Sequence, residues 1–155
     1  MVLVLLKTVH VLSAAVLFGT GLGIAFFMAM AHRSREPRTV ASVGAIVVKA
    51  DLVFTATAVL VQPLTGAGLL RLEGLRFAEP WLLATYGLYL LVGACWLPVV
   101  FIQERMRRLA AAAATAGGPL PPAYLRLYRI WFALGWPALG GVIAIYALML
   151  FKPAL

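Results

Sequence analysis

Residues 3–31 decide the fold of this chain, and they read LVLLKTVHVLSAAVLFGTGLGIAFFMAMA. Lys7 and His10 carry the only ionisable side chains in this stretch, and the other residues are almost all apolar or small. Because about 20 apolar residues cross the hydrocarbon core of a bilayer as a helix, the stretch predicts a transmembrane span. It has no basic start and no small-residue cleavage site before polar sequence, so we expect a true span rather than a signal peptide.

Three further apolar stretches complete the pattern, within residues 46–70, 80–102 and 126–151. The chain of 155 residues is 64% hydrophobic and only 12% charged, and its mean hydropathy is +1.01. Soluble domains carry about 25% charged residues, so this composition places the chain among polytopic membrane proteins. Short connections make successive helices antiparallel neighbours, so we predict an all-α, four-helix up-down transmembrane bundle that forms a single domain over residues 1–155.

The basic residues gather in two of the three connections. Residues 33–38 carry three arginines against one glutamate, and residues 104–129 carry five against one, whereas residues 71–79 are balanced. Because cytoplasmic loops are rich in lysine and arginine, we expect the first and third connections on the cytoplasmic side of a bacterial inner membrane, with both termini outside. The net charge of +8 comes mainly from these helix ends. No basic stretch alternates with aromatic residues, so we expect no nucleic-acid partner.

His10 is the most informative single residue, because an ionisable side chain in hydrocarbon marks a functional site or a paired interior group. It lies roughly 10 Å deep in the first span. Counting along the other three spans brings Gln62, Tyr86, Tyr89 and Tyr146 to the same outer layer. Two interpretations stay open: a cofactor or substrate site near the outer face, or a hydrogen-bonded layer that holds the bundle together.

Haem b is the cofactor most compatible with a helix histidine among aromatic residues. His10 and His32 lie about 33 Å apart along one helix, which excludes a bis-histidine haem within one chain. A haem iron would therefore be held by His10 alone, by His10 with another kind of ligand, or across a homodimer. Zinc and di-iron spacings are missing from the sequence, and Cys95 is its only cysteine. Met28 and Met30 are soft side chains that suit copper instead.

Lys49 and Asp51 lie where the second span is expected to reach the inner membrane boundary, at the end of an interfacial lead-in over residues 40–51. One interpretation is a proton or ion access point. The other, which we favour, is that Lys49 extends to the lipid headgroups and Asp51 pairs with a loop arginine such as Arg129.

Five blocks of the sequence together carry a resemblance to a known family. They are LKTVHVLSAAVLFGTGLG (6–23), DLVFTATAVLVQPLTG (51–66), GACWLPVV (93–100), RIWFALGWPA (129–138) and FKP (151–153). The chain resembles a family of small bacterial predicted integral membrane proteins of unknown function. The resemblance covers nearly the whole chain, and it implies four spans without supplying an activity.

A more distant similarity links Lys7, His10 and Gly19 to the first span of the HemJ-type porphyrinogen oxidases and the CopD-type copper-resistance membrane proteins. The Lys152-Pro153 pair is similar to the end of the HemJ type. This likeness implies a haem b held partly by His10. The HemJ type has a further histidine in its third span, whereas residues 80–102 have none, so only His10 carries over as a ligand.

Three functions are consistent with these observations, and whether the protein is an enzyme stays open. The first is a site organised by His10 that binds haem b for electron transfer or haem handling. The second is a non-catalytic accessory or assembly subunit of a larger membrane complex, with His10 as an interhelical contact. The third is a transporter of copper or of a small solute.

Overall fold

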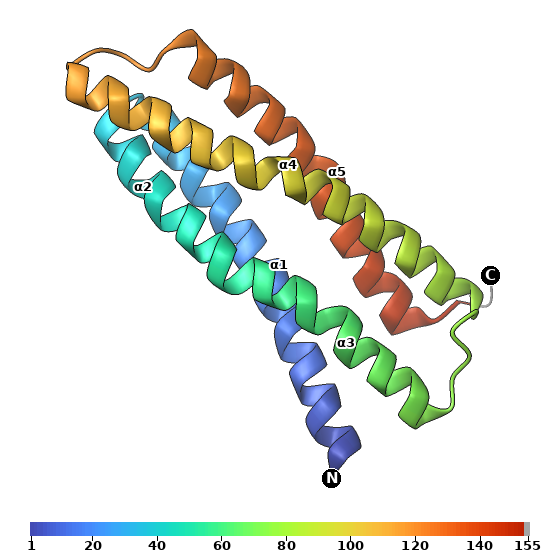
Figure 1. Cartoon of the computed structure of the whole chain (residues 1–155). Coiled ribbons are helices and arrows are strands. Elements are labelled where there is room, and N and C mark those ends of the chain that lie inside the picture. The colour runs from blue at the N-terminus through green and yellow to red at the C-terminus, as the bar shows by residue number, and fades with distance from the viewer. Residues whose placement is uncertain (154–155) are drawn as a thin grey trace.

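The computed structural model describes residues 1–153, and its secondary structure is helical (Figure 1). The elements are α1 (Val2–Ser34), α2 (Pro37–Ala50), η1 (Asp51–Thr55), α3 (Ala56–Glu73), α4 (Pro80–Ala116) and α5 (Pro122–Phe151). The π-helical turn η1 joins α2 and α3 into one continuous rod, Pro37–Glu73. Within the described residues, four rods are long and apolar enough to cross a membrane. The predicted all-α membrane bundle is confirmed.

The rods begin and end where the sequence supplies the expected residues. Pro37, Pro80 and Pro122 open their helices in the first turn, where the missing backbone N–H costs nothing. Gly74 and Gly117 follow α3 and α4 with φ values of 67° and 66°. Glycine adopts this left-handed conformation without a steric penalty, so both helices stop cleanly.

The tightest packing lies at the end of the bundle that carries the 33–38 and 117–121 connections. Val40, Met106, Ala110 and Tyr124 are completely buried there, in a cluster that also includes Ile24, Met28, Ala31, Val47 and Trp131. The rod Pro37–Glu73 and α4 are each 37 residues long, about 55 Å at 1.5 Å per residue. Both are longer than the roughly 30 Å of hydrocarbon that they cross.

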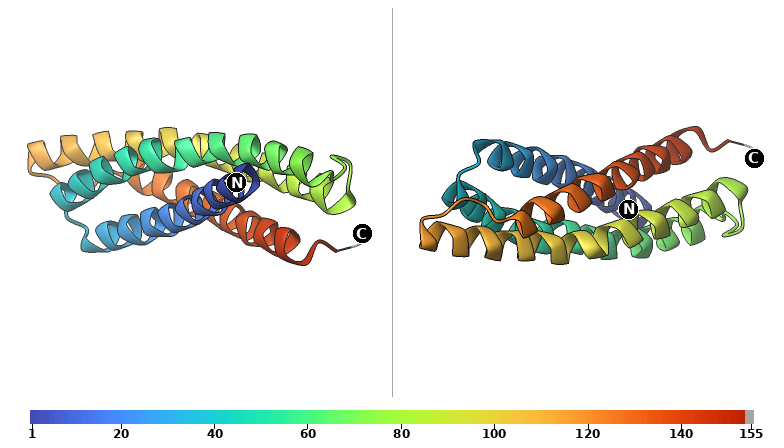
Figure 2. Two further views of the ribbon diagram at one scale, coloured as in Figure 1. Left: turned by 90° about the horizontal axis from the view of Figure 1, so that it is seen from below. Right: turned by 90° about the horizontal axis from the view of Figure 1, so that it is seen from above.

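Residues 40–51, which the sequence predicts as an interfacial lead-in to the second span, pack against α4 in this core. Val40, Gly44, Val47 and Asp51 fall on one helical face, and all four are buried. At Gly44 a β-carbon would lie 3.3 Å from the Arg107 Cβ of α4, so glycine permits a close approach of the two helices. Figure 2 shows α2 lying along the second half of α4.

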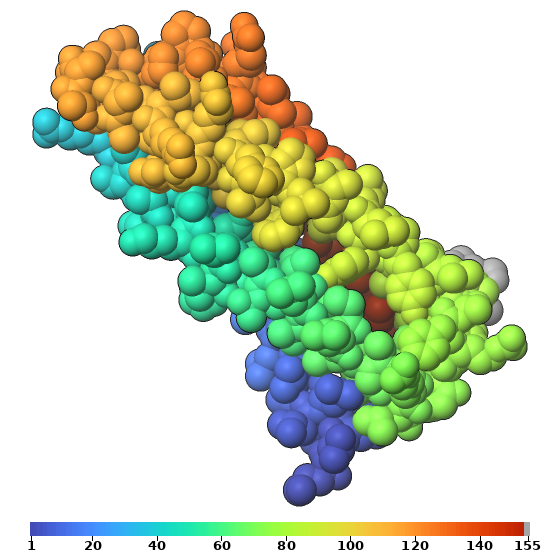
Figure 3. Space-filling model, viewed as in Figure 1, coloured from blue at the N-terminus to red at the C-terminus, as the bar shows by residue number. Residues whose placement is uncertain are grey.

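Toward the other end the helices separate into two pairs, α1 with α3 and α4 with α5. The two pairs are linked by the six-residue turn between Glu73 and Pro80 and by few direct contacts. α1 and α5 cross one another (Figure 2). The space-filling view is hollowed between α3 and α4, and α5 is visible at the bottom of the opening (Figure 3).

Candidate functional site

A cavity of about 360 Å³ lies between the α1–α3 pair and the α4–α5 pair. All four rods contribute to its wall, which is mostly aliphatic and aromatic. Its hydrogen-bonding side chains are Asp51, Thr55, Gln62, Tyr89, Trp96, Gln103, Trp131, Trp136 and Tyr146. Tyr89 and Trp96 belong to the apolar stretch 80–102, so the cavity lies at membrane depth.

Asp51 is the charged residue of this wall, and only 3% of its surface is exposed. It begins η1, and π-helical turns of this kind are frequent at functional sites. Its Oδ1 accepts a hydrogen bond of 3.1 Å from Nε1 of Trp96 on α4. Trp96 belongs to the apolar stretch 80–102, so the bond brings Asp51 beside a residue of the third span.

The other carboxyl oxygen of Asp51 is unsatisfied. Its Oδ2 is buried and has no hydrogen-bond partner within residues 1–153. Two further wall atoms share this condition, Thr55 Oγ1 and Gln103 Oε1. The ion pair expected between Asp51 and Arg129 does not form in the described chain, since Arg129 is exposed and the ion pairs lie elsewhere. Lys49 is also exposed and takes no part in the wall.

Aromatic rings cover much of the wall around this carboxyl group. They are Phe18, Tyr89, Trp96, Trp131, Phe132, Trp136 and Tyr146. Along α5 the row of rings continues from Trp131 to Tyr128, whose ring stacks on His32 with centroids 3.6 Å apart. Aromatic faces carry negative potential and attract cations. A wall of this kind therefore reinforces the charge of Asp51.

His10 lies one turn beyond the cavity, between α1 and α3. Its Nδ1 is 2.7 Å from Thr65 Oγ1, and Gln62 Nε2 donates a 2.8 Å hydrogen bond to its backbone carbonyl. A β-carbon at Gly66 would lie 3.5 Å from its Cε1, so the ring lies close to α3. Thr65 Oγ1 is also 2.7 Å from the Val61 carbonyl. If the hydroxyl donates its one proton there, His10 carries its proton on Nδ1 and keeps a lone pair on Nε2.

The three tyrosines predicted to share a layer with His10 have different positions. Tyr89 donates its hydroxyl to the backbone carbonyl of Val59 and thereby links α4 to α3. Tyr146 lines the cavity and meets Phe18 edge-on, with centroids 5.8 Å apart. Tyr86 is 38% exposed and points away from the cavity wall. The structure therefore groups Gln62 with His10 and places Tyr89 and Tyr146 in the wall.

The cavity does not suit haem. Within the described chain, the wall contains no histidine, methionine or cysteine, and its one charged residue is an acid that would oppose the haem propionates. His10 lies outside this wall, where its Nδ1 contacts Thr65 Oγ1. Met28 is buried in the inner cluster while Met30 is exposed, so these two side chains do not face one site.

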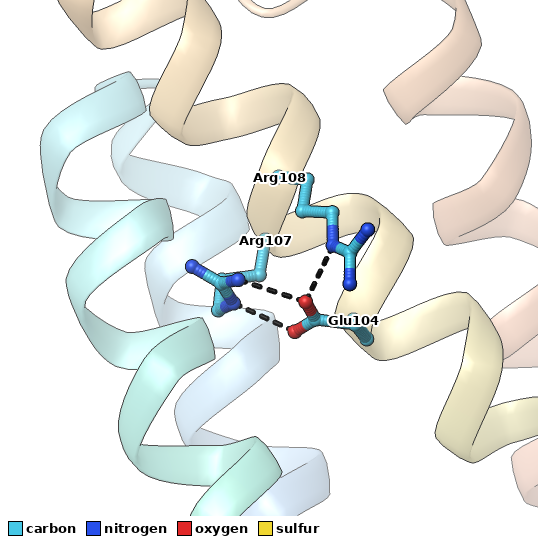
Figure 4. Close-up of polar contacts among 3 residues, drawn as sticks. All are labelled: Glu104, Arg107 and Arg108. Carbon is cyan, nitrogen blue, oxygen red and sulfur yellow. Dashed lines mark hydrogen bonds and ion pairs between the residues drawn. The ribbon is translucent and has the colours of Figure 1, made fainter.

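Charged groups at the helix ends form local pairs. Glu104 accepts hydrogen bonds from Arg107 at 2.7 and 2.8 Å and from Arg108 at 2.6 Å (Figure 4). Lys7 pairs with Glu73 and ties the start of α1 to the end of α3. These pairs are largely exposed and contribute little to stability.

Sequence reasoning missed Thr55, Trp96 and Gln103 as members of a site. A signal for them exists, since Tyr89, Trp96 and Gln103 recur every seven residues and thus share one helical face. Asp51, Thr55 and Gln62 form a similar polar stripe on the second rod. Both stripes contribute to the cavity wall, and Asp51 and Trp96 join them by a hydrogen bond.

Residues 4–153 match the family described as "Predicted integral membrane protein (DUF2269)". The curated proteins and the solved structures contain no match to this chain, so the similarity to the HemJ and CopD types gains no support from them.

Proposed function

The chain belongs to the DUF2269 family of predicted integral membrane proteins, and from that premise we propose that it binds a small, largely apolar ligand in its membrane cavity. The observation that carries this proposal is a cavity of about 360 Å³ that residues from all four rods line. Volumes of this order are typical of ligand pockets, which combine apolar walls with a few polar groups. A carrier of small solutes is the class of protein that this arrangement supports.

The glycines of the wall support the same interpretation. A β-carbon at Gly21, Gly93 or Gly135 would meet no atom within 4 Å, so larger side chains at these positions would fit. Filling a cavity ordinarily stabilises a protein, because unfilled volume costs about 24 cal/mol per Å³. An open space that three positions leave unfilled is therefore consistent with a ligand.

The experiment is native mass spectrometry of the full chain purified in a mild detergent. We expect a small molecule to accompany the wild-type protein and to be lost from Gly93→Leu, whose side chain enters the cavity. Gly87→Leu is the matched control, because Gly87 is on the same helix, is exposed and lies outside the wall. Equal ligand content in both variants and the wild type would contradict the proposal.

We propose that the packed end of the bundle faces the cytoplasm of a bacterial cell and that both termini lie outside. The arginine-rich connections at residues 33–38 and 104–129 support this orientation. A reporter such as alkaline phosphatase, active only outside, is expected to be active when fused after Pro153 and inactive when fused at Gly118. The reverse pattern would overturn the orientation.

A second candidate function is haem binding by His10, and the hydrogen bond between Nδ1 and Thr65 favours it. Nε2 would hold the iron of a haem that lies against α1 and α3, outside the cavity or between two copies of the chain. Such a haem would supply one-electron chemistry. The test is an absorption spectrum of protein from haem-replete cells. A Soret band that disappears in His10→Ala and persists in His32→Ala supports it, and colourless wild-type protein rejects it.

A further inference from the structure

We propose that the ligand of the cavity is a lipophilic amine in its protonated form, with the Asp51 carboxylate as its counter-charge. This proposal rests on the proposed function, because it names the chemical class of the molecule that the cavity binds.

The first support is the incomplete hydrogen bonding of the Asp51 carboxyl group. Oδ1 is bonded to Trp96, but Oδ2 is buried without a partner among the described residues. An ionised carboxylate at this depth lacks a cation within the described chain, and burying a charge without one is costly. A cationic N–H group supplies the charge partner that the ionised state needs, in a hydrogen bond stronger than a neutral one.

The second support is the group of unsatisfied polar atoms among the residues of the wall. Gln103 Oε1, Thr55 Oγ1 and Asp51 Oδ2 are buried oxygen atoms that have no hydrogen-bond partner in the described chain. Gln103 is 2% exposed, so bulk water does not reach it freely. All three oxygens can accept from a cationic N–H group, whereas an anion would be repelled by the Asp51 carboxylate.

The third support is the aromatic character of the remaining wall. Trp96, Trp131 and Trp136 line the same space as Asp51, and tryptophan is the side chain that attracts cations most strongly. The attraction is strengthened when the cation is desolvated, as it would be at this depth. No lysine, arginine or histidine belongs to the described wall to neutralise Asp51 instead.

The route to the cavity suits a lipophilic molecule. The hollow between α3 and α4 exposes α5 to the side of the bundle, at the level of the spans (Figure 3). A molecule that partitions into the bilayer can therefore reach the cavity laterally without crossing the packed end. An amine with an apolar body combines this partitioning with a charge for Asp51.

The experiment compares two probes of the same shape, para-bromo-N,N-dimethylbenzylamine and para-bromo-isobutylbenzene. The amine is protonated at neutral pH, and the hydrocarbon carries CH where the amine carries N–H. Bromine quenches nearby tryptophans, so the emission of Trp96, Trp131 and Trp136 reports occupancy of the cavity. The full chain is placed in phosphatidylcholine nanodiscs, and empty discs correct for partitioning of each probe into lipid.

We expect the amine to bind at least about tenfold more tightly than the hydrocarbon, and Asp51→Asn to remove this preference. The amide oxygen that Asp51→Asn introduces can still accept from Trp96, so the fold is retained, and circular dichroism and elution volume verify this. Glu104→Gln is the control that removes an acidic charge outside the wall.

The outcomes separate the two proposals. Binding of the hydrocarbon that Gly93→Leu abolishes, with no preference for the amine, overturns the amine proposal and leaves the ligand cavity standing. Equal quenching by both probes in wild type and Gly93→Leu overturns both. Retention of the amine preference in Asp51→Asn rejects Asp51 as the counter-charge.

Discussion

Trp96 donates its indole N–H to Oδ1 of Asp51 at 3.1 Å, and this single bond joins α4 to the π-helical turn of the neighbouring rod. It holds one carboxyl oxygen, while the other is buried without a partner in the described chain, in a residue that lines the cavity. Buried polar groups in proteins are almost always satisfied, so a half-satisfied carboxyl group within a span points to a missing partner. The account of the site depends on this relationship.

Trp96→Phe tests how much this hydrogen bond contributes to the stability of the protein. The variant keeps an aromatic ring but leaves both oxygens of Asp51 without a donor, which costs about 1–3 kcal/mol of unfolding free energy. Unfolding in mixed micelles titrated with dodecyl sulfate measures the loss. Trp136→Phe is the control, because Trp136 is 63% exposed and has no such bond in the described chain. Equal stability of the two variants would show that the bond contributes nothing.

Thr65→Val tests the contact that orients His10. The variant removes the hydroxyl that lies 2.7 Å from Nδ1 and preserves the shape of the side chain. Hydrogen bonds between membrane helices contribute about 0.6 kcal/mol on average, so we expect a small loss of stability. Thr57→Val is matched, since Thr57 is exposed and bonds only within its own rod. If the protein binds haem, Thr65→Val should also shift the Soret band, and Thr57→Val should not.

Gly44→Leu tests the close packing of α2 on α4. Its side chain would collide with Arg107, because a β-carbon at this position already lies 3.3 Å from the Arg107 Cβ. Overpacking of this kind costs about 1–3 kcal/mol of stability. Gly140→Leu is expected to be neutral, because Gly140 is exposed and a β-carbon there meets nothing within 4 Å. Thermal unfolding of the two variants in one detergent gives the comparison. A Gly44→Leu protein as stable as wild type would mean that the two helices do not approach this closely.

Glu36 gives the connection at residues 33–38 a pH-dependent contribution to stability. Its carboxylate accepts hydrogen bonds from the side chain and the backbone N–H of Thr39 and caps α2, which lowers its pKa from the ordinary value. Because its pKa is lower in the folded than in the unfolded protein, Glu36 stabilises the fold at pH values above its unfolded-state pKa, which is about 4.3. This stabilisation disappears as the pH falls through the folded-state pKa. Thermal midpoints of wild type and Glu36→Gln should therefore differ at pH 7 and converge in acid. A constant difference would contradict this assignment.

The sequence was sufficient to predict the membrane architecture, because apolar length alone determines which segments can span a bilayer. The four spans and the family were confirmed. The end of α4 at Gly117 was also predictable from the sequence, because the glycine and proline residues that follow do not continue a helix.

The site was harder to predict, because it depends on how far apart the helices lie. Counting residues along each span gave a common depth for His10 and Gln62, and the two are joined by a hydrogen bond. Depth alone does not specify direction, so the same count included Tyr86, which is exposed. The prediction paired Asp51 with Arg129, whereas the contacts of α2 with α4 bring that carboxyl group beside Trp96.

The most direct test of the central claim is the position of a bromine atom in crystals grown with para-bromo-N,N-dimethylbenzylamine, located by its anomalous scattering. The account predicts one peak among Trp96, Trp131 and Trp136 in the wild-type protein, with the amine nitrogen beside Asp51, and no peak there in Gly93→Leu. Bromine found only on the lipid-facing surface, with the space between the helix pairs filled by side chains, would contradict it.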